Sequence, residues 1–200
     1  MTIRSVPLIA VAGTFFLAGS TQAQGTKRDL GAHVHGAGKL NLAIEGQTVT
    51  MELSAPAHDI VGFEFQPRTD KQKAAVEQAT AMLRDASKIF TLSPAAGCTV
   101  ASASAELVFE ARAGPAPAAE GPFAKDHASA NSAEAGHSEF EGRYSFACKN
   151  TAALSEIGFP YFKLFPKADE IEAQVIAPKG QRSFEIKRGQ PRLSLRNLTS

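Results

Sequence analysis

The stretch that decides the fold is KLNLAIEGQTVTMEL, residues 39–53. Apolar and polar residues alternate on both sides of the turn Glu45-Gly46-Gln47. Such alternation places one face of each strand against a core. The residues on that face are Leu40, Leu42, Ile44, Val49, Met51 and Leu53. The stretch therefore predicts a two-stranded hairpin with one buried side.

One amphipathic helix is expected to follow the hairpin, at about residues 69–86. Thr69 and Gln72 can form a capping box, in which each side chain satisfies a free backbone N–H at the helix start. The apolar residues that then recur at helical spacing are Val76, Ala79, Leu83 and Ala86. Their spacing predicts a helix with one face against the sheet.

Five more segments have the composition and spacing of strands. They are residues 97–111, 137–148, 170–178, 181–188 and 191–196. With the hairpin they bring the count to about seven strands. The predicted fold class is α+β, an antiparallel sheet of about seven strands with one main amphipathic helix packed on it.

Residues 111–136 differ in composition from the rest of the chain. Ten of these 26 residues are Ala, six are Gly or Pro, and Phe123 is the one large apolar side chain. Such a segment cannot bury enough surface to offset its ordering entropy. We expect a low-complexity, disordered loop inserted in a single domain.

Residues 1–23 are typical of a secretory signal peptide. Arg4 precedes an apolar run from Val6 to Leu17, and small residues lead to a cleavage point after Ala23. A run of about a dozen apolar residues is too short to span a membrane. Residues 24–200 are therefore expected to form one exported domain that is not inserted in the membrane.

The charge of this mature chain excludes one class of partner. Cleavage removes Arg4 and no acid, so 21 basic residues become 20, equal to the 20 acidic ones. A nucleic-acid partner normally requires a basic surface, so none is expected.

The chain contains two cysteines, Cys98 and Cys148. An even count in an exported protein is most simply explained by a disulfide. The alternative is a thiolate metal site, although the sequence contains no CxxC pair.

Histidine spacing suggests a metal site. His33 and His35 are separated by one residue, as are His137 and Glu139, so each pair can point to one side of an extended segment. Three imidazoles and a carboxylate form a suitable tetrahedral zinc set. The alternative is that His33 and His35 lie in a solvated tail.

The remaining candidates in the sequence are weaker. His58 precedes Asp59 and can be a ligand, a cap or a surface residue, while His127 lies in the low-complexity loop. Glu64 is interpreted as structural. Copper is the rival ion, because imidazole suits it and the general affinity order favours it over zinc.

Taken in order, these motifs resemble the ZrgA-type family of periplasmic proteins associated with bacterial zinc uptake. The motifs are HVHG, the hairpin, AHDIVGFEFQPRTDKQKAAVEQA, GC before a strand, the insert, HSEFEGRYSFAC, and an aromatic end with LFP. The resemblance implies a periplasmic accessory protein that binds zinc and assists its import by a transporter.

Two positions depart from that family pattern. The insert, which is usually histidine-rich in the family, keeps His127, with His137 just after its end. Phe65 stands where the family places a histidine.

Enzymatic motifs are missing from the sequence, which contains no HExxH, no GxSxG and no phosphate-binding glycine loop. We therefore expect a binding protein and not an enzyme. The alternative function is an exported non-metal binding or structural interaction module in which the histidines are incidental.

Overall fold

A computed structural model describes residues 35–109 and 137–199. The predicted hairpin is confirmed as strands β1 (Ala37–Glu45) and β2 (Thr48–Pro56), which pair antiparallel with Leu42 opposite Met51. All six apolar residues expected on one face are buried. The alternation of the sequence therefore determines which side of the hairpin forms the core.

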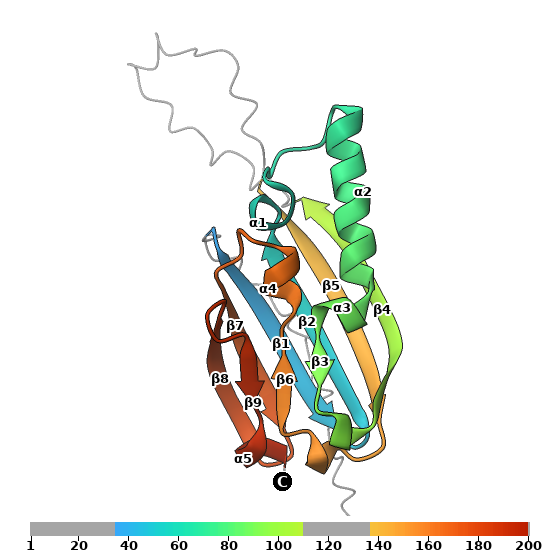
Figure 1. The fold of residues 1–200 in the computed structure, drawn as a ribbon, viewed down its shortest axis with the longest axis vertical. Coiled ribbons are helices and arrows are strands. Elements are labelled where there is room, and N and C mark those ends of the chain that lie inside the picture. The colour runs from blue at the N-terminus through green and yellow to red at the C-terminus, as the bar shows by residue number, and fades with distance from the viewer. Residues whose placement is uncertain (1–34, 110–136, 200) are drawn as a thin grey trace, which may run out of the picture. The chain divides into compact units, whose positions relative to one another are not determined.

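The hairpin lies in the middle of a six-stranded sheet of order β4-β5-β2-β1-β7-β8 (Figure 1). The added strands are β4 (Cys98–Phe109), β5 (Ser138–Cys148), β7 (Glu170–Ala177) and β8 (Gly180–Lys187). The α+β class is confirmed, but the expectation of a purely antiparallel sheet is wrong, because β1 and β7 run parallel. The chain crosses the face of the sheet after β5 and enters β7 from the end where β1 begins.

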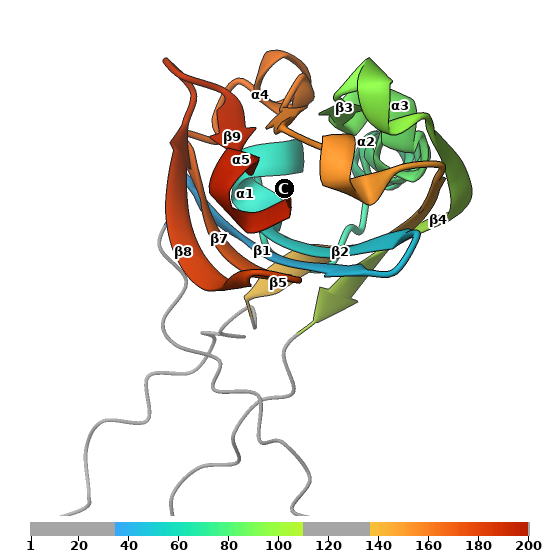
Figure 2. The same cartoon turned by 90° about the horizontal axis from the view of Figure 1, so that it is seen from below.

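The other elements all lie on the concave side of this sheet, as Figure 2 shows. Strands β3 (Thr91–Leu92), β6 (Glu156–Gly158) and β9 (Arg192–Ser194) form a second small sheet. The helices are α1 (Ala57–Val61), α2 (Asp70–Arg84), α3 (Ala86–Ile89), α4 (Tyr161–Leu164) and α5 (Arg196–Thr199), with 3-10 turns at Pro94–Ala96 and Thr151–Ala153. The hydrophobic core fills the space between the two layers.

Helix α2 begins as the sequence predicts. The Thr69 hydroxyl accepts a hydrogen bond from the Gln72 N–H at 3.2 Å, and the Gln72 side chain accepts one from the Thr69 N–H at 3.0 Å. The helix ends at Arg84, earlier than expected, because Asp85 leaves the helical conformation. Within the described residues, no helix is long and apolar enough to cross a membrane.

The predicted disulfide is confirmed. Cys98 and Cys148 are bonded, and they are register partners on the neighbouring strands β4 and β5. The bond links the start of β4 to the end of β5, so the insert at 111–136 belongs to the stretch of chain that it closes into a loop.

Two buried tyrosines, Tyr144 and Tyr161, differ in whether the hydroxyl group is hydrogen-bonded, so they form a matched pair for a stability test. The Tyr144 hydroxyl donates a hydrogen bond to the Leu83 carbonyl at 2.9 Å, whereas that of Tyr161 has no partner within the described residues. An unpaired buried hydroxyl is costly, so Tyr161→Phe is expected to leave the free energy of unfolding unchanged or raise it by up to about 1 kcal/mol. Tyr144→Phe should lower it by about 1 kcal/mol. Urea denaturation measures both, and a large loss in Tyr161→Phe would contradict this assignment.

Candidate metal centre

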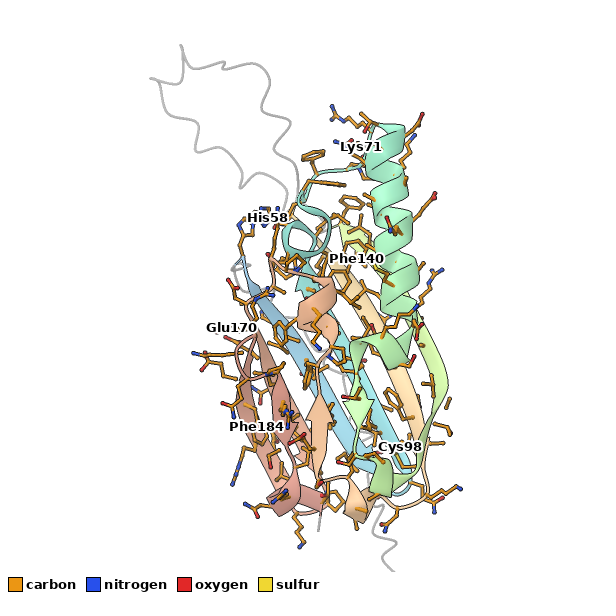
Figure 3. All side chains as sticks on the ribbon, in the orientation of Figure 1. His58, Lys71, Cys98, Phe140, Glu170 and Phe184 are labelled. Atoms are coloured by element: carbon orange, nitrogen blue, oxygen red, sulfur yellow. A yellow bond between two sulfur atoms is a disulfide. The ribbon has the colours of Figure 1, made fainter. Side chains whose placement is uncertain are left out.

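Several strand ends meet at one end of the six-stranded sheet. Pro56 at the end of β2 pairs with Glu139 near the start of β5, and Lys39 near the start of β1 pairs with Ser54. The first residues of β1 and β7 also pair, Ala37 with Glu170. Figure 3 labels His58 at this end and Cys98 toward the other. The candidate residues come from the segments that enter or leave these strands.

Helix α1 carries His58 and Asp59 to this end of the sheet, because it begins directly after Pro56. The helix closes at Gly62, whose φ of 88° is left-handed and whose N–H bonds the His58 carbonyl at 3.0 Å. Glycine adopts this conformation without the steric cost that other residues have. The turn redirects the chain so that Glu64 follows close to the start of β5.

Glu64 joins two of the histidines. Its Oε1 lies 2.8 Å from Nε2 of His35, and its Oε2 lies 2.7 Å from Nδ1 of His137. The carboxylate side chain is 14% exposed, whereas the imidazoles are 56% and 61% exposed. The Ser138 hydroxyl donates to the Glu64 carbonyl at 2.6 Å and so ties this loop to β5. One carboxylate therefore brings together two imidazoles that are 102 positions apart in the sequence (137 − 35).

Electrostatics keep Glu64 ionised. Desolvation raises its pKa, but the hydrogen bonds from His137 and His35 outweigh that effect and hold the pKa below its usual value. A carboxylate with a lowered pKa is charged throughout the neutral and mildly acidic range. Glu64 can thus serve as an anionic ligand or as an acceptor for imidazole N–H groups.

His58 lies against the same cluster. Its ring stacks on the ring of His35, with centroids 4.4 Å apart and planes 22° from parallel. Its Nδ1 faces Oδ1 of Asp59 at 3.5 Å. A third imidazole therefore stands beside the two that contact Glu64.

As the side chains stand, the described residues contain no group of three or more His, Cys, Asp or Glu that could hold a metal ion. The distances between these side chains are those of hydrogen bonds and not those between ligands of one metal ion. Two ligands on one tetrahedral zinc ion lie about 3.3 Å apart, since each bond is about 2.0–2.1 Å long. The N–O separations around Glu64 are 2.8 and 2.7 Å, so the groups bond each other directly.

The structure places the predicted site residues unequally. His35, His137 and His58 meet in the cluster, whereas Glu139 is 7% exposed and accepts a hydrogen bond from the Ser54 hydroxyl. The predictions that fall outside the described part of the chain are His33, His127, the expected signal peptide at 1–23 and the insert at 111–136. The assignment of the ligands stays a prediction.

The sequence did not indicate the contacts that Glu64 makes with His35 and His137. The residue lies between two aromatic residues, Phe63 and Phe65, in a segment without clear periodicity. The one available signal was an acid six residues after His58 in a connection rich in apolar residues.

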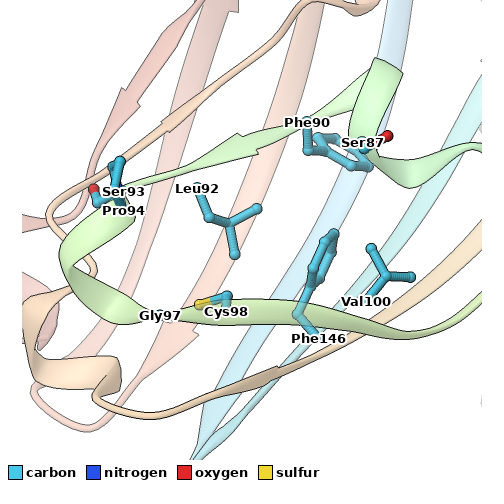
Figure 4. A pocket seen from close by; sticks show the side chains of 9 residues that line it. All are labelled: Ser87, Phe90, Leu92, Ser93, Pro94, Gly97, Cys98, Val100 and Phe146. Atoms are coloured by element: carbon cyan, nitrogen blue, oxygen red, sulfur yellow. The ribbon is translucent and has the colours of Figure 1, made fainter.

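A small pocket beside the disulfide is lined by no histidine, aspartate or glutamate among the described residues, unlike the cluster around Glu64. The side chains around it in Figure 4 are apolar or carry hydroxyls, and they include Phe90, Leu92, Val100 and Phe146. It lies near the start of β4, away from the strand end that carries the histidines. Its lining suits an apolar group more than a metal ion.

The fold and the cluster define a class: a small α+β protein with a histidine and carboxylate cluster at one end of its main sheet. The chain belongs to the ZrgA family, whose model, described as ZrgA family zinc uptake protein, matches residues 32–195. The resemblance inferred from the motifs is thereby confirmed. No match was found among curated proteins.

Proposed function

We propose that the protein captures zinc in the periplasm and assists its import by passing the ion to a transporter component. The observation that carries this proposal is the contact of one Glu64 carboxylate with both His35 and His137. The membership in a zinc uptake family supports zinc as the ion.

The ligands in this proposal are His35, His58, His137 and Glu64. Three imidazoles and one carboxylate match the ligands that zinc prefers. Glu64 takes the place that the sequence suggested for Glu139, because Glu64 is the carboxylate that contacts the imidazoles. His33 adds a further imidazole close to the site in sequence.

The half-exposed imidazoles suit capture and release better than permanent retention. Closed structural zinc sites are held by four fixed protein ligands. Here two imidazoles are more than half exposed, so the ion can enter and leave from solvent. The sequence carries none of the common hydrolase motifs, which supports a binding protein over an enzyme.

Calorimetry on metal-free, untagged protein tests the proposal. We expect one zinc ion per chain at pH 7.5 and at least about 100-fold weaker affinity at pH 5.5. Free imidazole titrates near pH 6.5, so each coordinating imidazole costs about tenfold over this interval. Glu64 contributes little to the change, because its lowered pKa keeps it ionised at both values.

The same titration with copper identifies the preferred ion, since imidazole ligands accept both metals. Absence of zinc binding at pH 7.5, or a pH effect below tenfold, would contradict the proposal. Absence of zinc binding would favour the alternative of an exported interaction module that binds no metal.

A further inference from the structure

Asp59 is a buried acid that contacts two of the three segments that carry the clustered imidazoles, those of His35 and His58. Its side chain is 2% exposed. Oδ2 accepts a hydrogen bond from the Gly36 N–H at 2.8 Å, and Oδ1 faces Nδ1 of His58 at 3.5 Å. The carboxylate lies in the first turn of α1 but makes no cap there. Its oxygens are directed instead to His58, a proposed ligand, and to Gly36, the residue after the proposed ligand His35.

The contact with Gly36 determines how the chain enters β1. Gly36 has a φ of 89°, and its carbonyl accepts hydrogen bonds from the N–H groups of Asp169 at 2.7 Å and Glu170 at 2.9 Å. A Cβ at this position would lie 3.1 Å from Oδ2 of Asp169. The backbone of Gly36 is therefore held by Asp59 through its N–H and by Asp169 and Glu170 through its carbonyl. These bonds fix the point from which the preceding residue, His35, leaves the sheet.

The contact with His58 favours one ring nitrogen as the metal ligand. A carboxylate only accepts hydrogen bonds, so the nitrogen that faces it is favoured when it carries the proton. With the proton on Nδ1, the lone pair of neutral His58 is on Nε2. Carboxylates commonly orient metal-binding histidines in this way.

We propose that Asp59 is the positioning residue of the metal centre: it holds His58 with Nε2 free for zinc and fixes Gly36 so that His35 reaches the same ion. The inference rests on the proposed function and adds a residue that does not itself touch the ion. An acid that is 2% exposed and directs its oxygens at Gly36 and His58 is more than a solvated surface group.

The variant Asp59→Asn separates positioning from packing, because the two side chains have nearly the same shape. The amide oxygen can still accept from Gly36, which leaves the NH₂ group facing His58. That group donates, so Nδ1 must present its lone pair and the proton moves to Nε2. Zinc affinity is expected to fall by about 10- to 100-fold.

Two measurements read out this variant. Ring-nitrogen NMR spectra of the metal-free protein report the tautomer of His58, and calorimetry at pH 7.5 reports zinc affinity. The matched control is Asp169→Asn, which removes the same charge beside Gly36 from an exposed side chain. The control should retain the wild-type tautomer and an affinity within about threefold of wild type.

A wild-type His58 with its proton on Nε2 would overturn the inference, and this measurement needs no variant to fold. So would an Asp59→Asn protein that binds zinc within about threefold of wild type. A wild-type protein that binds no zinc would instead contradict the proposed function, while the spectra still report the orientation of His58.

Discussion

Replacing His35 and His137 together with alanine is expected to abolish tight zinc binding, with a loss of more than about 100-fold in affinity. The two imidazoles are those that contact Glu64, and they come from different segments, so the remaining chain retains at most His58 and Glu64 of the proposed set. Removal of two of the four ligands leaves water at two of the four positions around the zinc ion. Calorimetry at pH 7.5 on metal-free protein measures the loss.

The control for this variant is His127→Ala, which removes an imidazole from the low-complexity insert. We expect it to bind zinc nearly as the wild type does, because an assembled site outcompetes a single imidazole outside it. The double variant is expected to fold normally, because the imidazoles of His35 and His137 are 56% and 61% exposed and contribute little to stability. If the double variant binds one zinc ion with unchanged affinity, the cluster around Glu64 is not the site.

Removing the disulfide is expected to have the largest effect on stability. The variant Cys98→Ala with Cys148→Ala should lower the free energy of unfolding by about 4 kcal/mol, because the bond closes a long loop in the unfolded chain. The two cysteines are separated by 50 positions in sequence. Alanine is the suitable replacement, since Cys148 is buried in the core and serine would add an unpaired hydroxyl there.

Urea denaturation of the variant and of the wild type, each with and without a thiol reductant, measures this effect. The reductant should destabilise the wild type by a similar amount and leave the variant unchanged. A loss below about 1.5 kcal/mol would show that the cross-link restricts the unfolded chain much less than the loop model implies.

Local patterns predicted the framework of the fold. The alternation in residues 39–53 identified both strands of the hairpin and their buried face, because side-chain direction along a strand depends only on position. Thr69 and Gln72 identified the start of α2, since a capping box involves residues three apart. Cys98 and Cys148 were paired correctly, because only one pairing of two cysteines exists.

The parallel pairing of β1 and β7 was not predictable in the same way. Each strand shows alternation on its own, but alternation does not state which neighbour a strand takes or in which direction. That choice depends on how β6 and α4 cross the concave face before β7 begins. Tertiary packing therefore decided the mixed character of the sheet.

The amino-acid sequence by itself determined the class of the fold, the disulfide and the imidazoles His35, His58 and His137 as candidates. Only the tertiary structure decided that Glu64 contacts two of them and that Asp59 lies behind the third. Glu64 is 29 residues from His35 and 73 from His137. Contacts over such separations follow from strand pairing and core packing, which no local spacing in the chain encodes.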